Sequence, residues 1–304
     1  MSALRGHHRQ AALLALATLP MLALWAWPVR LPEVWAGLSF TQWHTLVELG
    51  SMGVCAAIAA VAWNARELEV PRSVRLLGSA CVGALLLDAA HALSFPGLPD
   101  LIGSNTSTRT VALFMASRLL IALAILCVAA LPWRLEHDPR WVVRSVRWVP
   151  AGVAAYVLIV VGWVFAAPDS LPTLVRDGES LTLAKRAGEG LLIGLFLAAS
   201  VLFARRLKAP QPFDVPSLLC AAVLMAIGEV VLTMYTRLSD LALVVGHVYK
   251  VLGFWMVYRT IVADSIRGPY QRLLDSRHKL RHNEEELRTI TDNIPAMVAF
   301  VDSE

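Results

Sequence analysis

Charged residues are scarce in this sequence. Asp, Glu, Lys and Arg make up only 16% of the 304 residues, 57% are hydrophobic, and the mean hydropathy is +0.60. Soluble domains carry roughly 25% charged residues, so this composition excludes an ordinary soluble domain and is typical of an integral membrane protein. The formal net charge of +4 is small and scattered among loops, so we expect no nucleic-acid partner.

Cysteine is also scarce. The four cysteines, Cys55, Cys81, Cys127 and Cys220, all lie inside apolar runs and show no CxxC spacing. We therefore expect neither a disulfide framework nor a thiolate metal cluster. The four side chains are interpreted as small buried hydrophobic groups.

Long apolar runs dominate the chain instead. A membrane-spanning helix needs about 20 mainly apolar residues, and the sequence contains about eight such runs. They lie near residues 9–27, 40–64, 74–95, 108–132, 146–167, 183–204, 216–236 and 241–262. We predict an all-α fold, a polytopic transmembrane bundle of about eight helices.

Arginine and lysine are concentrated in alternate loops between these runs. The richer set of loops holds Arg5, Arg9, Arg66, Arg72, Arg75, Arg134, Arg140, Arg144, Arg147, Arg205, Arg206 and Lys208. Cytoplasmic loops carry the excess of positive residues in membrane proteins. Both termini are therefore expected in the cytoplasm, which agrees with an even number of spans.

Ionisable side chains inside the apolar runs are the strongest functional signal. A helix rises 1.5 Å per residue, so the depth of each ionisable residue can be counted along its run. Ionisable residues of several runs then fall into one layer, roughly 6–15 Å below the outer interface. The layer contains His44, Glu48, Asp88, His91, Arg118, Glu229, His247 and Lys250. Spacings of three or four residues place His44 with Glu48, and Asp88 with His91, on shared helix faces. Because such residues are costly in a bilayer, we expect them to face the bundle interior and to have a role.

Several chemistries fit this layer. A transition-metal site suits imidazole and carboxylate ligands, with zinc, iron, copper or manganese as one or two ions. Its candidate ligands are His44, Glu48, Asp88, His91, Glu229 and His247. Haem b, with two of the three histidines as axial ligands, is an alternative, and so is a pocket for a small polar ligand.

Buried ion pairing is the remaining interpretation of the layer. Arg118 and Lys250 would then neutralise the carboxylates and fix the helix register. The same two cations could instead recognise an anionic ligand. Glu189, one turn inside Lys185 and Arg186, would line the same cavity or lie at the interface. An intramembrane metal-dependent hydrolase, with Glu48 as general base, is a competing function.

The segment after the last run has a different pattern. Leu273, Leu280 and Leu287 repeat every seven residues among mostly charged ones, which predicts either a short parallel coiled coil, and thus a homodimer, or a solvated amphipathic linker. Gly268-Pro269 fits a hinge at which a new helix begins. The following stretch ELRTITDNIPAMVAFVD resembles the beginning of a PAS domain.

Four separated segments resemble one known family. WHTLVELGSMGVCAAIAAVAWNAR, LLLDAAHALSFPG, MASRLL and IGEVVLTMYTRLSDLALVVGHVYKVLGFWMVYRTIV are similar, in this order, to the third family of membrane-associated sensor domains. The resemblance implies an input region of the bacterial inner membrane, joined through PAS domains to a diguanylate cyclase, phosphodiesterase or histidine kinase. It implies a receptor rather than an enzyme, with any catalytic output domain beyond residue 304.

The expected domain organisation follows from these segments. Residues 1–37 would hold a cytoplasmic start and the first transmembrane helix, and residues 38–268 the sensor domain. Residues 269–288 would form a signalling helix or coiled-coil linker, and residues 289–304 a truncated start of a PAS domain. The helix that carries His247 would conduct a change in site occupancy to the heptads.

Overall fold

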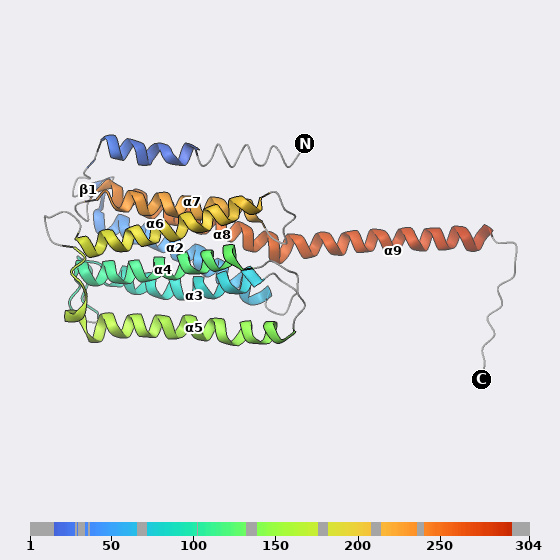
Figure 1. Ribbon diagram of the computed structural model, residues 1–304, viewed down its shortest axis with the longest axis horizontal. Coiled ribbons are helices and arrows are strands. Elements are labelled where there is room, and N and C mark those ends of the chain that lie inside the picture. The colour runs from blue at the N-terminus through green and yellow to red at the C-terminus, as the bar shows by residue number, and fades with distance from the viewer. Residues whose placement is uncertain are drawn as a thin grey trace. The chain divides into compact units, whose positions relative to one another are not determined.

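The computed structural model describes most of the chain in two compact units, Met1–Ser265 and Ile266–Glu304 (Figure 1). The described residues are 15–27, 29, 34–35, 37–65, 72–101, 103–131, 139–175, 182–207, 214–235 and 240–293. Within them the chain is almost entirely helical, so the predicted all-α fold is confirmed.

The first unit is a bundle of long helices (Figure 1). They are α2 (Phe40–Asn64), α3 (Arg72–Leu93), α4 (Ser107–Ala130), α5 (Pro139–Ala166), α6 (Leu183–Arg206), α7 (Val215–Leu232) and α8 (Leu241–Val262). In the described part of the chain, these seven helices are long and apolar enough to cross a membrane. The predicted run 9–27 is described only in part, as the shorter apolar helix Ala15–Ala26.

Polar residues at the helix starts explain where several helices begin. Ser39 forms a capping box with Gln42 at the start of α2, and Thr106 and Thr182 accept backbone N–H groups at the starts of α4 and α6. These side chains satisfy amide groups that have no partner inside the helix. A short hairpin of β1 (Val34–Trp35) and β2 (Leu38–Ser39) precedes α2, with Val34 opposite Ser39.

Helix ends differ from the ends of the apolar runs. α7 ends at Leu232 rather than near residue 236, and Thr233 forms its C-cap, with a hydroxyl that donates to the Val230 carbonyl oxygen at 2.7 Å. α5 begins at Pro139, earlier than the apolar run at residue 146, since a helix can continue past the membrane into polar sequence. Hydropathy therefore marks the part of a helix suited to lipid, not the whole helix.

Six of the helices form a closed ring. The neighbours around it are α2, α3, α4, α6, α7 and α8, and α8 packs back on α2. α5 lies outside this ring, against α3 and α4. The largest apolar core cluster lies inside the ring, with Ile58 of α2, Phe196 of α6 and Phe254 of α8 fully buried. Every ring helix thus has two neighbours within the ring and one inward face.

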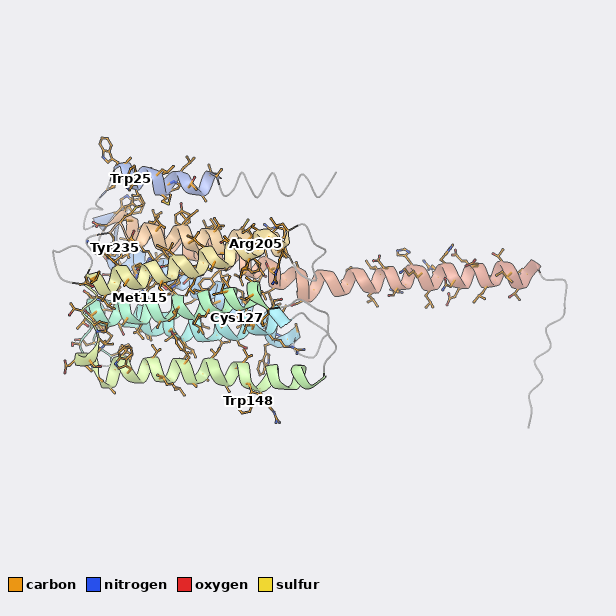
Figure 2. The ribbon with its side chains drawn as sticks, viewed as in Figure 1. Trp25, Met115, Cys127, Trp148, Arg205 and Tyr235 are labelled. Atoms are coloured by element: carbon orange, nitrogen blue, oxygen red, sulfur yellow. The ribbon has the colours of Figure 1, made fainter. Side chains whose placement is uncertain are left out.

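The outer surface of the bundle is apolar. α5 exposes Trp148, Leu158 and Ile159, and Figure 2 shows Trp148 pointing away from the other helices. Large exposed apolar surfaces of this kind suit contact with lipid. All four cysteines are free. Cys55, Cys81 and Cys220 are buried as predicted, whereas the prediction is wrong for Cys127, which is exposed.

Helical structure continues from the first unit into the second. α8 is followed by a π-helical turn, η3 (Ala263–Arg267), and then by α9 (Gly268–Asn293). π-helical turns occur mostly within α-helices and frequently at functional positions. Residues 294–304, and with them most of the predicted start of a PAS domain, lie outside the described residues.

Candidate functional site

Three histidines from three helices meet inside the ring. His44 lies near the start of α2, His91 near the end of α3 and His247 near the start of α8. Their side chains are buried, and the Nε2 atoms of His44 and His91 are 3.2 Å apart. We call this end of the bundle, where α2, α4, α6 and α8 begin and α3 and α7 end, the histidine end.

Backbone carbonyl groups set the orientation of two of these rings. His91 Nδ1 lies 2.8 Å from the Thr110 carbonyl oxygen, and His247 Nδ1 lies 2.7 Å from that of Leu243. A carbonyl oxygen can only accept, so each Nδ1 carries the proton and, in the neutral ring, each Nε2 keeps a lone pair. Phe95 stacks on His44 with ring centres 4.0 Å apart. The Nε2 atoms of His91 and His247 are therefore both held toward Glu48 Oε1.

Glu48 and Asp88 share one cation beside the histidines. Lys250 Nζ lies 3.0 and 2.8 Å from the two carboxylate oxygens of Glu48, and 2.8 Å from Asp88 Oδ2. All three side chains are buried. Two carboxylates facing one ammonium leave an excess negative charge when the histidines are neutral. A buried excess charge is costly, so the group favours a further cation, either a proton or a metal ion.

Close acceptor atoms support the same conclusion. His247 Nε2 lies 3.0 Å from Glu48 Oε1, and His91 Nε2 lies 3.7 Å from the same oxygen. A lone pair and a carboxylate oxygen repel each other at this distance unless a positive charge lies between them. The contact therefore needs either a proton between the two atoms or a cation shared by both groups.

The spacing of these atoms fits a metal ion. His44, Glu48, His91 and His247 each offer one ligand atom, and these four atoms lie within 4.8 Å of one another. Tetrahedral coordination with bonds of about 2.0–2.1 Å separates ligand atoms by roughly 3.3 Å. Three of the six separations, 3.0, 3.2 and 3.7 Å, are close to this value, and all six are within 4.8 Å. The site can therefore hold a transition-metal ion with three imidazole ligands and one carboxylate ligand.

A second buried charge cluster lies on the α4, α6 and α7 side of the ring. Arg118 Nε donates to Glu229 Oε1 at 2.5 Å, and Lys185 donates to Glu189 within the first turns of α6. The Lys185 ammonium also lies 5.0 Å from the centre of the Tyr235 ring. Two cations match two carboxylates here. In contrast to the group of Glu48, Asp88 and Lys250, this cluster has no net charge without an added ion.

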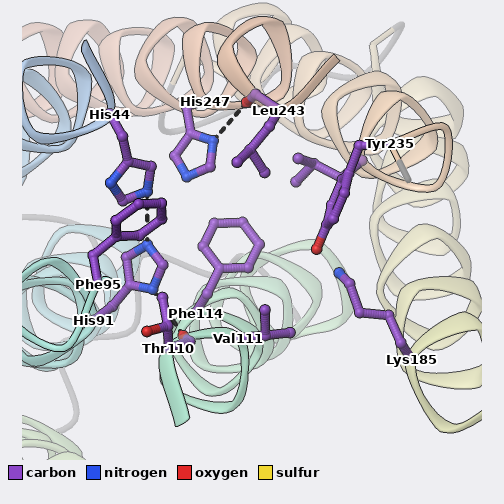
Figure 3. A pocket seen from close by; sticks show the side chains of 11 residues that line it. His44, His91, Phe95, Thr110, Val111, Phe114, Lys185, Tyr235, Leu243 and His247 are labelled. Carbon is purple, nitrogen blue, oxygen red and sulfur yellow. Dashed lines mark hydrogen bonds between the residues drawn. The ribbon is translucent and has the colours of Figure 1, made fainter. Parts of the chain in front are cut away.

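A small cavity connects the two clusters (Figure 3). The three histidines line one side, and Tyr235 and Lys185 line the other. Phe114 and Leu243 contribute apolar walls between them. The cavity measures about 20 Å³, which is room for one or two water molecules, since one water needs about 10–15 Å³.

The structure assigns partners to every residue of the predicted layer. It brings His44, Glu48, His91 and His247 together. Asp88 forms an ion pair with Lys250, and Glu229 forms one with Arg118. Lys185 and Tyr235 were not among the predicted site residues. The i,i+4 spacing of Lys185 and Glu189 could have indicated the buried pair, whereas Tyr235 follows an apolar helix end and carries no such signal.

Comparison with known proteins identifies the class. Residues 37–269 match the family model MASE3, a membrane-associated sensor domain. Because the match covers more than half of the chain, the chain belongs to this family of membrane-associated sensor domains. It confirms the predicted family resemblance, and the class is a sensor domain rather than a catalytic one. No curated protein and no solved structure matches the chain.

Proposed function

We propose that this sensor domain works through a transition-metal ion held by His44, Glu48, His91 and His247. Zinc, iron, copper and manganese all accept these ligands. In this proposal Asp88 shares Lys250 with Glu48 and balances its charge, while the Arg118–Glu229 pair stabilises the ring. The observation that carries the proposal is the convergence of three imidazoles and one carboxylate within 4.8 Å in a buried position.

Further support comes from the hydrogen bonds that orient the candidate ligands. Metal-binding histidines usually donate the other ring N–H to a carbonyl or carboxylate, as His91 and His247 do here. A divalent ion would also convert the negative excess of the Glu48, Asp88 and Lys250 group into a positive one. The same group without a metal would need an added proton.

The signal would leave the site through α8. His247 and Lys250 both lie on this helix, and helical structure continues through η3 into α9. A change in occupancy would shift or rotate α8, and a two-state coiled coil would respond to the shift. Downstream, we propose a PAS domain and a diguanylate cyclase, phosphodiesterase or histidine kinase output.

The proposed setting is the bacterial inner membrane, with both termini in the cytoplasm. The arginine-rich loops support this orientation, and it places the histidine end toward the outside. A homodimer through α9 fits the same arrangement. Leu273, Leu280 and Leu287 are 58%, 62% and 64% exposed, so the heptad stripe is available to a second copy.

The alternatives have weaker support. A porphyrin needs a slot of several hundred Å³, whereas the cavity beside the histidines measures about 20 Å³, so haem b is less favoured than an ion. A hydrolase needs a free general base, yet both oxygens of Glu48 accept from Lys250. A metal-ion sensor therefore remains the better interpretation.

The test is the metal content of detergent-purified protein, measured by mass spectrometry after growth with added metals. We expect stoichiometric metal, and its loss in His44→Ala and His247→Ala. His282→Ala is the matched control, because this histidine lies on the exposed α9 and should not affect metal content. Folded wild-type protein that contains no transition metal would contradict the proposal.

A further inference from the structure

The cavity offers a metal ion an open side. Of the four candidate ligands, the three histidines line the cavity, whereas Glu48 lies one helical turn beyond His44, against Lys250. A metal ion held by the imidazoles would therefore also border the cavity. With Glu48 bound as well, a ligand from the cavity would take a fifth coordination position, an expansion that zinc sites with an exogenous ligand can undergo.

The far side of the cavity offers hydrogen-bond donors. Tyr235 and Lys185 are buried, and Figure 3 shows the Tyr235 hydroxyl beside the Lys185 ammonium, across the cavity from the histidines. The walls between are apolar, with Phe114, Val111 and Leu243. A molecule spanning the cavity would thus meet a Lewis acid at one end and donors at the other.

Charge and size restrict what can fit. A divalent ion would leave the group of Glu48, Asp88 and Lys250 with one net positive charge, and the second cluster is neutral. A single negative charge would therefore make the buried site neutral, which an apolar interior favours. The cavity volume of about 20 Å³ limits the occupant to a few atoms.

We propose that the cavity binds a small monoanion of two or three heavy atoms, which coordinates the metal ion at one end and accepts hydrogen bonds from Tyr235 and Lys185 at the other. This inference rests on the proposed metal site. The sensor would then be a receptor for a small anion, which binds the metal ion and the Tyr235–Lys185 pair together, rather than a receptor for the metal ion alone.

Azide, a linear monoanion of three atoms, is a suitable probe. We would load the full chain with cobalt(II), titrate it with sodium azide at constant ionic strength, and follow the visible cobalt bands and the azide infrared stretch. The expected result is saturable binding that changes both spectra. Protein that holds cobalt but shows no azide-dependent change would overturn the inference while leaving the metal site intact. Failure to bind cobalt would overturn both.

Variants of the far side test the role of the donors. Tyr235→Phe should retain cobalt, weaken azide binding about tenfold, as expected for one lost hydrogen bond, and shift the azide stretch. Tyr156→Phe is the matched control, since its hydroxyl donates to the Ala116 carbonyl at 2.9 Å and does not line the cavity. Equal azide affinity in these two variants would overturn the assignment of Tyr235.

Two further variants separate binding from folding. Val111→Phe should fill the cavity and abolish the azide response with cobalt still bound. Lys185→Met/Glu189→Leu removes a buried ion pair as a unit, which avoids an unpaired charge, and should weaken azide binding by at least tenfold. Wild-type azide affinity in both variants would show that azide binds elsewhere, against the proposal.

Discussion

At the scale of single residues, the interior of the ring contains charges that are stable only with their partners. Arg118 and Glu229 are almost fully buried and come from α4 and α7. Removing one member of such a pair leaves an uncompensated charge, whereas replacing both by apolar residues is often neutral. Single and double replacements therefore distinguish an ion pair that only stabilises the fold from one that binds a ligand.

Arg118→Met should destabilise the bundle by about 3–5 kcal/mol, because Glu229 then remains buried without its cation. The double variant Arg118→Met/Glu229→Leu should recover most of this loss, with metal content unchanged. Thermal unfolding in detergent measures both. Arg288→Met is the control, because Arg288 and Asp292 form a highly exposed pair and their loss should not change stability measurably. A double variant as unstable as the single one would argue against simple pairing.

Residue depth could be predicted from the sequence, but pairing could not. Counting residues along each apolar run places His44, His91 and His247 at similar depths. The same counting gives no position around the ring, so it could not assign Lys250 to Glu48 and Asp88 or Arg118 to Glu229. Partner choice depends on which helices are neighbours, and that order is set by packing.

At the scale of elements, α9 carries an apolar stripe that is exposed. Leu273, Leu280 and Leu287 repeat at heptad spacing, and each is more than half exposed. An isolated amphipathic helix gains little from intrinsic propensity and is usually stabilised by packing of its apolar face. In the proposed homodimer, a second copy of the chain would supply that packing.

Cysteine cross-linking in membranes tests this pairing. Leu280→Cys should form an intermolecular disulfide on mild oxidation, because equivalent heptad positions face each other in a parallel dimer. His282→Cys is the matched control, since two residues along a helix turn the side chain by about 200°. Both are made with Cys127→Ser, which removes the exposed native cysteine. Equal cross-linking at both positions would not support a heptad interface.

At the scale of the whole molecule, the side of the membrane from which the cavity can be reached depends on which end of the bundle faces outward. Ser170, in the 3-10 helix η2 (Pro168–Ser170), is exposed at the histidine end, and Arg205 is exposed at the other end of α6. The hydropathy of the helices is the same in either orientation. Only the positive residues of the loops distinguish the two, so the sequence predicts orientation through the loops alone.

Labelling with a membrane-impermeant maleimide tests the orientation. In the Cys127→Ser background, Ser170→Cys should react in intact cells, with the outer membrane permeabilised if one is present. Arg205→Cys should react only after the inner membrane is opened. The reverse pattern would place the histidine end in the cytoplasm and exclude an external small-anion signal reaching the cavity directly.

The position of α5 outside the ring determines the direction of the ring helices. Because α5 carries the chain back across the bundle, α4 and α6 are neighbours that run in the same direction, as are α2 and α8. Four ring helices therefore begin at the histidine end and only two finish there. Helix starts carry a partial positive charge and helix ends a partial negative one. The ring therefore has a net positive backbone potential at the first turns of the histidine end, so the fold itself favours negative charge at that end.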